Sequence, residues 1–373
     1  MENCCKRILQ LGKFYPIGGG VEKVMYELTT GLSARGVDCD MLAASCHSHG
    51  LVTQLNPHAT LTACRTWLKA AATTIAPSMI TRLRKICNQY DIIHIHHPDP
   101  MACLALRLSG YRGKVILHWH SDIQKQKMLL QAYLPLQNWL LRRADLILGT
   151  SPTYLKESPH LAKFQHKMQV LPIGVDPIPD DPQGARRIQA QYPGKQLIFS
   201  LGRLVAYKGY RYLIEAARYL PDNYMVLIGG KGPLQAELTE LIQRYRLEER
   251  VKLLGRVSDA DLPAYYHACR LFCLSSVFKT EAFGIVQIEA MSCGKPLVAT
   301  TIPQSGVAWV NAHGVSGLNV PPADAQALAN AIRQITESDD TYKAFAQRSR
   351  QRYENTFTKQ QMISQAIHIY NQL

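Results

Sequence analysis

The stretch QLIFSLGRLVAYKG, residues 196–209, decides the fold class of this 373-residue chain. Its first six residues are mostly apolar, which is typical of a short buried strand. The strand delivers Arg203 to its carboxyl end, and Lys208 is expected to begin a helix beside Gly209. A strand that enters a loop and then a helix is the repeating unit of a parallel α/β sheet. The stretch therefore predicts such a unit, with two cations at the edge where ligands bind.

The same pattern recurs along the chain. In the second half, four more segments look like strands that enter loops: YMVLIGGKG, VKLLGRV, LFCLSS and PLVAT. In the first half, a strand in CKRILQLGKF and a helix in VEKVMYELTTGLSARG are followed by VDCDMLAAS, DIIHIHH, KVILHWH and ADLILGTS. A long helical stretch from about Asp324 closes the chain. The alternation predicts two parallel sheets covered by helices.

Residues 171–195 are the best candidate for a linker, because they hold five prolines and three glycines. The length of the chain also favours two domains. We therefore predict an α/β protein with two Rossmann-like domains facing a central cleft, residues 1–176 and 177–354. A C-terminal helix of about residues 355–373 is expected to pack back on the first domain.

The composition is that of an ordinary globular protein, with 47% hydrophobic and 19% charged residues. No apolar run approaches the roughly 20 residues of a membrane span. The N-terminal segment has no signal-peptide core, so a cytoplasmic location is expected. The ten cysteines form no CxxC pair, which favours reduced and mostly buried thiols over a zinc site.

The net charge of +14 is concentrated in the first half of the chain. Residues 1–176 hold 20 Lys and Arg against 11 Asp and Glu, whereas residues 177–373 hold 22 against 17. Such a surface attracts phosphate-rich partners. The basic residues are scattered, and no RRM, KH or helix-turn-helix signal accompanies them, so nucleic acid is not an expected partner.

Two features of the sequence suit a diphosphate. Arg203 can grip phosphate oxygens through two N–H groups, and Lys208 acts as a point charge. In PIGGGVEK, residues 16–23, three glycines precede a helix that is expected to start near Val21, so backbone amides can approach an anion. This loop is neither a GxGxxG fingerprint nor a P-loop. Solvated surface cations and a flexible turn are the alternative interpretations.

Residues 281–289, EAFGIVQIE, place two carboxylates eight positions apart. Glu281 falls in the loop after a strand, and Glu289 lies over a turn further along the helix that follows. An ionised carboxylate only accepts hydrogen bonds, which suits a pair of sugar hydroxyls. The start of the helix presents to phosphate oxygens the amides of Phe283, Gly284, Ile285 and Val286. One glutamate can thus hold a sugar and the other a ribose, with a diphosphate between them; an ordinary surface helix is the alternative.

His120, in HWHSD at residues 118–122, ends a strand and is expected in the cleft, facing the second domain. A histidine there can donate a hydrogen bond or relay charge beside a reacting centre, or serve as a hydrogen-bonded structural residue. The segment HIHH, residues 94–97, also ends a strand. His94 and His96 share one strand face, and packing is favoured over metal binding because no carboxylate or cysteine stands at ligand spacing.

Together, these motifs resemble those of family 4 glycosyltransferases, which are retaining enzymes of the GT-B fold. The shared pieces run over nearly the full length: GGG-V-E, H-S-D, L-P-I-G-V-D, G-R-L…K-G, G-G-x-G-P, E-A-F-G…E-A-M-S-C-G-K-P and G-V-S-G-L-N-V-P-P-A-D. Two pieces depart from the family pattern: Ala282 replaces the first glycine of E-G-F-G, and residues 303–309 replace a Gly-Gly pair followed by an acid. The order and spacing of the motifs make the resemblance specific.

The resemblance implies a role for each motif. Glu281 would contact the hydroxyls of the donor sugar, and Glu289 the ribose of the nucleotide. Arg203 and Lys208 would hold the diphosphate, and His120 would lie beside the anomeric carbon, so His120 and Glu281 are the expected catalytic residues. Further contacts with the nucleotide-sugar are expected from Gly19, Gly20, Val257, Phe283, Gly284, Ile285 and Val286. No metal or other cofactor is expected, because the two cations would neutralise the leaving group.

The expected activity is transfer of a hexose from a nucleotide diphosphate sugar to a growing glycan, with retention of the anomeric configuration. We favour mannose from GDP-mannose and bacterial O-antigen or polysaccharide synthesis, because L-G-K-F-Y-P-I-G-G-G-V-E-K resembles mannosyltransferases of O-antigen assembly. A front-face reaction is favoured, since no side chain is an obvious nucleophile. A GT-B nucleotide-sugar epimerase and an inactive nucleotide-sugar-binding subunit are the alternatives.

Two segments of the first domain suit an anionic membrane surface. Residues 67–87 and 123–143 interleave lysine and arginine with aromatic and aliphatic residues. Ordinary core-facing helices with basic outer faces are the alternative. We expect peripheral attachment to the cytoplasmic leaflet, where a lipid-pyrophosphate-linked glycan acceptor would be presented.

Overall fold

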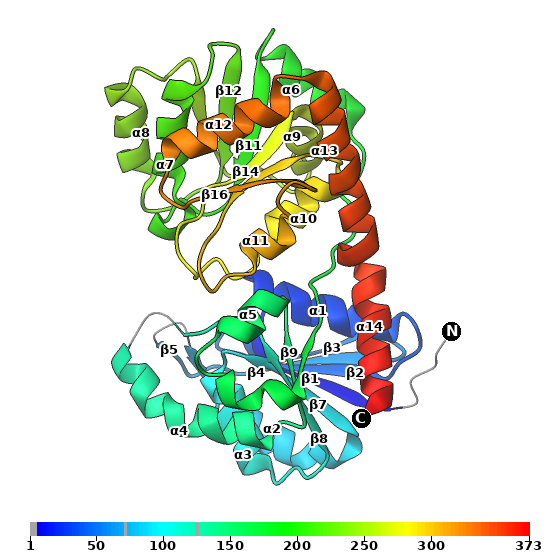
Figure 1. Cartoon of the computed structure of the whole chain (residues 1–373). Coiled ribbons are helices and arrows are strands. Elements are labelled where there is room, and N and C mark those ends of the chain that lie inside the picture. The colour runs from blue at the N-terminus through cyan, green and yellow to red at the C-terminus, as the bar shows by residue number, and fades with distance from the viewer. Residues whose placement is uncertain (1–5, 71–72, 124–126) are drawn as a thin grey trace. The chain divides into compact units, whose positions relative to one another are not determined.

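The structure of the protein is a computed structural model, which describes residues 6–70, 73–123 and 127–373. The chain forms two compact units, one of Met1–Ile173 with Lys359–Leu373 and one of Gly174–Thr358. Each unit is a sheet of mainly parallel strands between layers of helices (Figure 1). The predicted fold class, two parallel α/β sheets of Rossmann-like type, is therefore confirmed.

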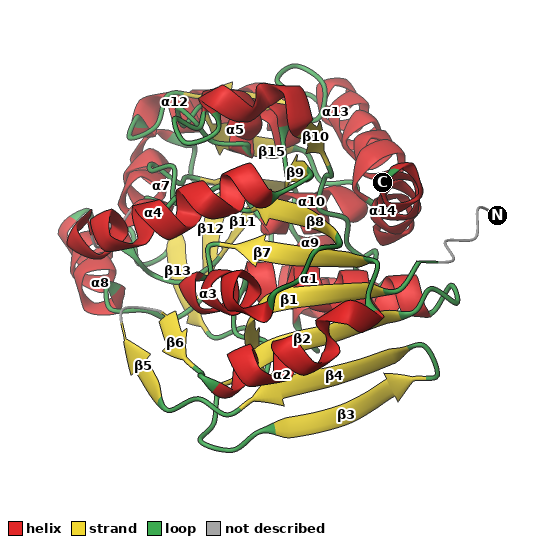
Figure 2. Ribbon diagram, turned by 90° about the horizontal axis from the view of Figure 1, so that it is seen from below, coloured by secondary structure: helices red, strands yellow, loops and turns green. Residues whose placement is uncertain are grey.

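The sheet of the first unit has the strand order β10-β9-β8-β7-β1-β2-β4-β3 (Figure 2). Its strands are β1 Ile8–Tyr15, β2 Cys39–Ser45, β3 Leu51–Asn56, β4 Ala59–Cys64, β7 Ile92–His97, β8 Lys114–Trp119, β9 Leu146–Gly149 and β10 Met168–Val170. Neighbouring strands pair in parallel except β3 and β4, which are antiparallel. The chain moves outward in one direction from β1 and in the other from β7, so the strand order reverses between these two strands.

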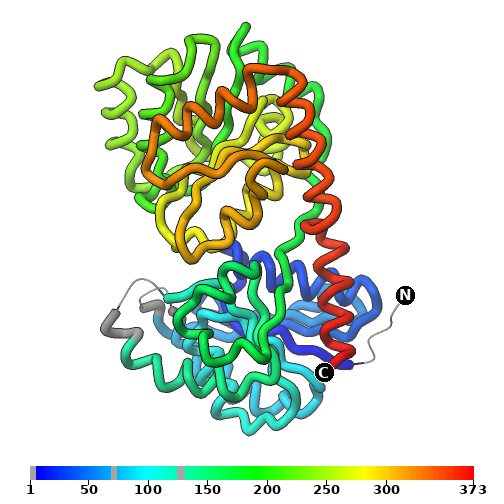
Figure 3. Tube along the Cα trace, viewed as in Figure 1, coloured from blue at the N-terminus to red at the C-terminus, as the bar shows by residue number. Residues whose placement is uncertain are grey.

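Helices cover both faces of this first sheet. One face carries α1 Gly20–Ser33 and α14 Lys359–Gln372, and the other carries α2 Ser78–Ile86, α3 Pro100–Ser109 and α4 Lys127–Arg143 (Figure 2). Helix α14, the red end of the tube in Figure 3, lies beside α1 although the two are distant in sequence. The Nη1 of Arg35, just after α1, donates a hydrogen bond of 2.8 Å to Ser364 Oγ. Two small elements complete the unit: α5 Pro152–Glu157 and a hairpin of β5 Leu68–Ala70 and β6 Thr73–Ile75.

The sheet of the second unit has six parallel strands in the order β13-β12-β11-β14-β15-β16. They are β11 Gln196–Leu201, β12 Tyr224–Gly229, β13 Val251–Gly255, β14 Leu271–Leu274, β15 Leu297–Thr300 and β16 Gly317–Val320. Here the strand order reverses between β11 and β14. The main apolar core lies between this sheet and α7 Tyr210–Ala216, α8 Gln235–Arg244 and α12 Ala325–Thr336. The opposite side holds α6 Pro182–Ala190, α9 Leu262–Ala268 and α10 Ile285–Ser292.

One prediction of local structure was wrong. Lys208 does not begin a helix: it ends a 3₁₀ turn, and α7 starts at Tyr210, because Gly209 adopts a left-handed backbone with φ 64°. The closing stretch is helical, as predicted, but it is divided into separate helices. It consists of α12, α13 Asp339–Arg352 and α14, with Ser338 capping α13 and a π-helical turn over Tyr353–Phe357.

Among the described helices, none has the length and apolarity to cross a membrane. The described cysteines are unbridged and most are buried.

Candidate functional site

The strand reversal in the second unit brings the predicted donor-site motifs together. The loop after β11 carries Arg203 and Lys208, and the loop after the neighbouring strand β14 carries Glu281. Open α/β sheets bind ligands outside the carboxyl ends of their strands, where the order reverses. The two motifs therefore meet at the position where this fold class builds its ligand sites.

Lys208 and Glu281 form a buried ion pair, which the sequence analysis did not anticipate. Their Nζ and Oε2 atoms lie 2.5 Å apart, and the two residues are 8% and 9% exposed. Ser276 Oγ donates a second hydrogen bond of 2.9 Å to the same carboxylate oxygen. An ammonium has three N–H groups and a carboxylate has two acceptor oxygens, so both partners keep bonding capacity beyond this pair.

The backbone beside Lys208 is fixed by close packing at Gly209. A Cβ atom at this glycine would lie 2.1 Å from the carbonyl oxygen of Ser275, in addition to the strain of the positive φ. Ser275 Oγ donates a hydrogen bond of 3.0 Å to the Lys208 carbonyl. The loops after β11 and β14 are thus held against each other, which positions Lys208 opposite Glu281.

Arg203 and Val257 lie on two loops at the same edge of this sheet, after β11 and β13, which are separated by β12. The side chain of Arg203 is exposed, and within the described residues it makes no ion pair. Its guanidinium is available to a ligand. Val257 follows β13 and packs against Gly229, where an added Cβ would lie 2.9 Å from Val257 Cγ2.

Helix α10 begins where the sequence analysis expected it, after the Phe-Gly step. Gly284 is its N-cap with φ 76°, so the amides of Ile285 and Val286 belong to the first turn. Phe283 is buried, and its ring lies 6.0 Å from that of Phe357. This packing fixes the entry of the chain into the helix, whose N-terminus favours an anion.

Glu289 lies one turn further along α10 and is 9% exposed. Tyr266 Oη donates a hydrogen bond of 2.8 Å to Glu289 Oε2. Burial raises the pKa of Tyr266, and the neighbouring carboxylate raises it further, so the phenol remains a donor. Tyr266 orients Glu289, a role that the sequence analysis missed because the two residues lie on different helices.

The strand reversal in the first unit places Lys13 beside Asp99, two residues that the sequence analysis also missed. The Lys13 amide donates a hydrogen bond of 2.5 Å to Asp99 Oδ2, and its Nζ donates to the carbonyl of Pro98. Burial lowers the pKa of Lys13, which the Asp99 charge partly offsets. Lys13 lies near the carboxyl end of β1, and Asp99 follows β7 by two residues, so both stand at the reversal point, which is the signal that could have identified them.

The glycine loop of the first unit leads directly into α1. Gly19 is the extended N-cap and Gly20 is the first helical residue, one position before the expected start. A Cβ atom at Gly19 would lie 2.6 Å from Glu22 Oε2, so the carboxylate of Glu22 folds over the glycine. Glu22 is buried, and a larger residue at position 19 would require its carboxylate to move.

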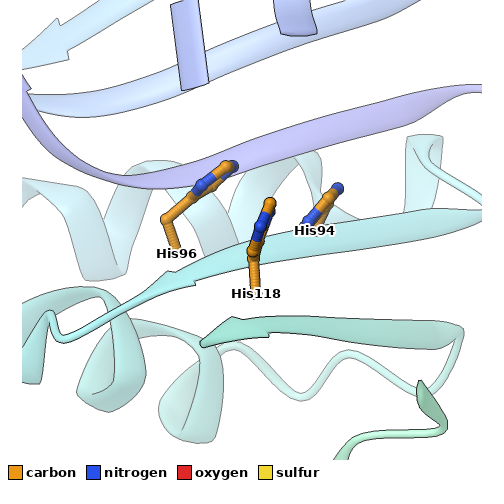
Figure 4. Close-up of side chains that lie close together, drawn as sticks. All are labelled: His94, His96 and His118. Atoms are coloured by element: carbon orange, nitrogen blue, oxygen red, sulfur yellow. The ribbon is translucent and has the colours of Figure 1, made fainter. Parts of the chain in front are cut away.

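His120 belongs to a buried group of four histidines on the face of the sheet covered by α14. The imidazoles of His96 and His120 stack with their centroids 5.2 Å apart, and those of His118 and His120 with 4.0 Å. Figure 4 shows three of the four rings, which rise from β7 and β8. Burial lowers the pKa of each, to about 3 for His118, so the rings are neutral.

The described residues include one group whose composition could suit a metal ion: His94, His96 and His118, whose ligand atoms lie within 4.8 Å of one another. However, both ring nitrogens of His96 are already hydrogen-bonded, at 2.9 and 2.8 Å. The rings of His94 and His96 are also nearly parallel, with an interplanar angle of 12°. In-plane lone pairs of stacked rings do not converge on one point, so this arrangement favours hydrogen bonding over metal coordination.

Comparison with known proteins agrees with this geometry. The profile described as "Glycosyl transferases group 1" matches residues 183–352, and "Glycosyltransferase Family 4" matches residues 18–178. The chain is 31% identical over 371 residues to the O-antigen chain mannosyltransferase C of Escherichia coli, covering 98% of both proteins. It is 30% identical over 356 residues to the D-rhamnosyltransferase WbpZ of Pseudomonas aeruginosa, covering 94% of this chain and 92% of that protein.

Solved structures show the same fold. Anabaena Alr3699/HepE in complex with UDP superposes with a TM-score of 0.80 at 23% identity, covering 98% of this chain and 100% of that one. Sucrose-phosphate synthase from Thermosynechococcus elongatus gives 0.78 at 24% identity, covering 98% and 99%. The two matching family profiles and the 31% identical relative identify a glycosyltransferase, and the solved structures show that its fold is GT-B. The chain belongs to glycosyltransferase family 4.

Proposed function

We propose that this enzyme is a retaining mannosyltransferase that uses GDP-mannose to extend a lipid-pyrophosphate-linked glycan in bacterial O-antigen or related polysaccharide synthesis. The sugar is supported by the two relatives above, whose names specify mannose and D-rhamnose. D-Rhamnose is 6-deoxymannose, so both names point to a sugar of manno configuration. The observation that carries the proposal is the Lys208–Glu281 pair at the strand reversal, together with Arg203 on the same loop as Lys208, whose exposed guanidinium forms no ion pair within the described residues.

The geometry supports a role for each predicted donor-site residue. Glu281 is proposed to accept hydrogen bonds from hydroxyls of the mannose, and Glu289, oriented by Tyr266, from those of the ribose. Lys208 and Arg203 are proposed to bind the diphosphate together with the first-turn amides of α10. Val257 is proposed to contact the base, and the amides of Gly19 and Gly20 a phosphate.

The same charges would serve the chemical step. The nucleoside diphosphate gains negative charge as its bond to the anomeric carbon breaks, and fixed cations stabilise that charge best in a site that excludes water. We propose a front-face reaction, in which a leaving phosphate oxygen takes the proton of the acceptor hydroxyl. His120 is proposed to contact the hexose.

Transfer is tested with purified protein, labelled GDP-mannose and a lipid-pyrophosphate-linked glycan. We expect a product with an α-anomeric bond, the configuration of the donor, and no transfer from UDP-glucose. Conversion of the donor without acceptor would instead identify an epimerase. GDP binding with neither reaction would identify a binding subunit. Both alternatives would contradict the proposal.

We also propose that the first unit attaches to anionic lipid. Three apolar side chains are exposed at the hairpin of β5 and β6: Trp67, just before β5, is 71% exposed, Leu68 57% and Ile75 42%. Leu68 and Ile75 are cross-strand partners, so these side chains are neighbours. Helix α2 follows at Ser78 and exposes Arg82, Arg84 and Lys85. Apolar residues beside exposed cations support an interfacial contact.

The second predicted membrane segment, residues 123–143, offers less support. Tyr133 and Leu140, which were expected on the lipid surface, are both buried against the unit. Residues 124–126 and the side chains of residues 127–130 lie outside the described part of the chain. The proposal therefore depends on the hairpin and α2.

Vesicle cosedimentation tests the membrane contact. Binding should require anionic lipid, weaken with salt, and fall for Trp67→Ser and for Arg82→Ser combined with Arg84→Ser and Lys85→Ser. Val52→Ser, on the exposed β3, is the matched control for loss of a surface hydrophobe. Equal binding to neutral vesicles, or none to anionic ones, would contradict this part of the proposal.

A further inference from the structure

Three hydrogen bonds join His120 to Tyr370 of helix α14 through the core of the first unit, and a fourth joins Tyr370 to His94. His120 Nε2 lies 2.9 Å from His96 Nδ1, and His96 Nε2 lies 2.8 Å from Gln10 Oε1. Gln10 Nε2 donates a hydrogen bond of 3.1 Å to Tyr370 Oη, and that hydroxyl lies 2.7 Å from His94 Nδ1. These five side chains are at most 4% exposed, so water does not compete for their hydrogen bonds.

The side-chain amide of Gln10 gives this chain of hydrogen bonds one direction. An amide oxygen can only accept, so the hydrogen between Gln10 Oε1 and His96 must lie on His96 Nε2. Neutral His96 then has an unprotonated Nδ1, which accepts from His120 Nε2–H. Neutral His120 in turn carries no hydrogen on Nδ1.

The hydrogen bonds at the Tyr370 end of this series run in the same direction. The hydroxyl oxygen of Tyr370 accepts from Gln10 Nε2, so its hydrogen is directed to His94 Nδ1. Every donor therefore points from His120 towards His94. Hydrogen bonds aligned in one direction polarise and strengthen one another.

We propose that Gln10, His96 and Tyr370 are positioning residues that hold His120 in its Nε2-protonated tautomer, so that Nδ1 is offered to the substrate as a hydrogen-bond acceptor. Within the described residues, Nδ1 of His120 has no hydrogen-bond partner, whereas its Nε2 is engaged by His96. The ring can therefore accept from a sugar hydroxyl but cannot donate to one. This inference rests on the proposed function for the identity of the ligand, but the tautomer itself does not depend on it.

The test uses the full chain labelled with ¹⁵N at histidine. Long-range ¹H–¹⁵N spectra distinguish a protonated Nε2 from a protonated Nδ1, and His120→Asn assigns the signals by their loss. The wild-type His120 should be protonated at Nε2. Gln10→Met removes the hydrogen bond between Gln10 and His96. Tyr370→Phe is a milder change that keeps the ring and removes the hydroxyl to which the Gln10 amide donates. Both variants should show a mixture of tautomers at His120.

Transfer activity is measured on the same samples. Both variants should lose about threefold to tenfold in kcat, the range that follows from one neutral hydrogen bond. Tyr90→Phe is the matched control, because this hydroxyl is also buried and bonded, to Asp40 at 2.7 Å, but does not contact the histidines. It should change neither the tautomer nor kcat.

The outcomes separate this inference from the proposed function. His120 protonated at Nδ1 in the wild type, or an unchanged tautomer in both variants, would overturn the positioning role. The expected tautomers in a protein that transfers no sugar from any donor would support the positioning role and overturn the proposed function instead.

Discussion

The charges of Glu281 and Lys208 stabilise each other because both side chains are buried away from water. Breaking a buried ion pair by neutralising one partner costs about 3–5 kcal/mol, since the other charge remains buried without compensation. We expect Lys208→Met or Glu281→Gln to lower the free energy of unfolding by this order, and the double variant to lose clearly less than the sum. Urea titration of the four proteins measures the coupling.

A surface pair provides the control for this cycle. Arg333 and Glu337 are an i,i+4 pair on α12, with side chains 45% and 52% exposed. Arg333→Met should cost less than about 1 kcal/mol. Additive losses for the Lys208 and Glu281 variants would show that the two charges do not stabilise each other.

The carboxylate of Glu289 provides a second prediction for a single residue. Glu289→Ala should reduce transfer by at least about tenfold, because a charged hydrogen bond contributes about 1.5–3 kcal/mol. Steady-state kinetics with varied GDP-mannose measures the loss. Glu237→Ala, on the first turn of α8, is a control with the same charge change. Near-native turnover of the Glu289 variant would remove the ribose contact from the proposed site.

At the scale of the elements, the junction between the 3₁₀ turn and α7 is a tightly constrained part of the backbone of the second unit. Alanine at Gly209 would combine a positive φ with a Cβ only 2.1 Å from a carbonyl oxygen. Gly314 has a similar φ of 75° but open space around its Cβ position. Gly314→Ala should cost about 1–2 kcal/mol, and Gly209→Ala should cost at least about 1–3 kcal/mol more.

Thermal unfolding of the two glycine variants measures this difference. Gly209→Ala should also weaken nucleotide binding, because the substitution displaces the loop that carries Lys208. Equal stability of the two variants would mean that the loop relaxes freely, which would contradict the close packing described for this junction.

The sequence predicted the elements whose signals are local. Buried strands such as β11 are short apolar runs, and the loops after β11 and β14 were correctly expected to carry the charged motifs. The antiparallel strand β3 was not anticipated, because its side chains are mostly exposed or half-buried and lack a clear apolar pattern. A separate last helix from about residue 355 was expected, whereas the break before α13 was not anticipated, because it depends on a single serine cap.

The contacts that complete the site are not local, which is why the sequence did not reveal them. Lys208 and Glu281 were assigned to different parts of a ligand, and only the pairing of β11 with β14 shows that they touch. Gln10 and Tyr370 are 360 positions apart in the chain. Neither belongs to a recognisable motif, so their relation to His120 follows only from the packing of α14 on the first sheet.

At the scale of the molecule, the buried histidines make stability depend on pH. Burial lowers the pKa of five of them: His94, His96, His97, His118 and His120. When unfolded they titrate near pH 6.5, so below that pH the unfolded chain binds more protons than the folded one. Stability should be unaffected by these groups above about pH 7 and fall as the pH drops below about 6.5.

Urea unfolding between pH 7.5 and 5.5 measures this dependence. Each histidine contributes up to about 1.4 kcal/mol per pH unit, so His118→Leu should give a shallower slope than the wild type. His49→Gln, at an exposed position, should leave the slope unchanged. A His118→Leu slope equal to that of the wild type would show that this histidine becomes protonated in the folded protein.

The measurement that most directly tests the proposed donor site is calorimetric titration of GDP and of guanosine into the wild type and Arg203→Gln. The account predicts that the wild type binds GDP more tightly than guanosine, because the site is built around the diphosphate. Arg203→Gln should weaken GDP binding by about tenfold or more and leave guanosine binding unchanged. Arg244→Gln, an exposed arginine on α8, is the control and should bind both ligands normally. Equal losses for GDP and guanosine, or no loss for either, would contradict a diphosphate site at the strand reversal of the second unit.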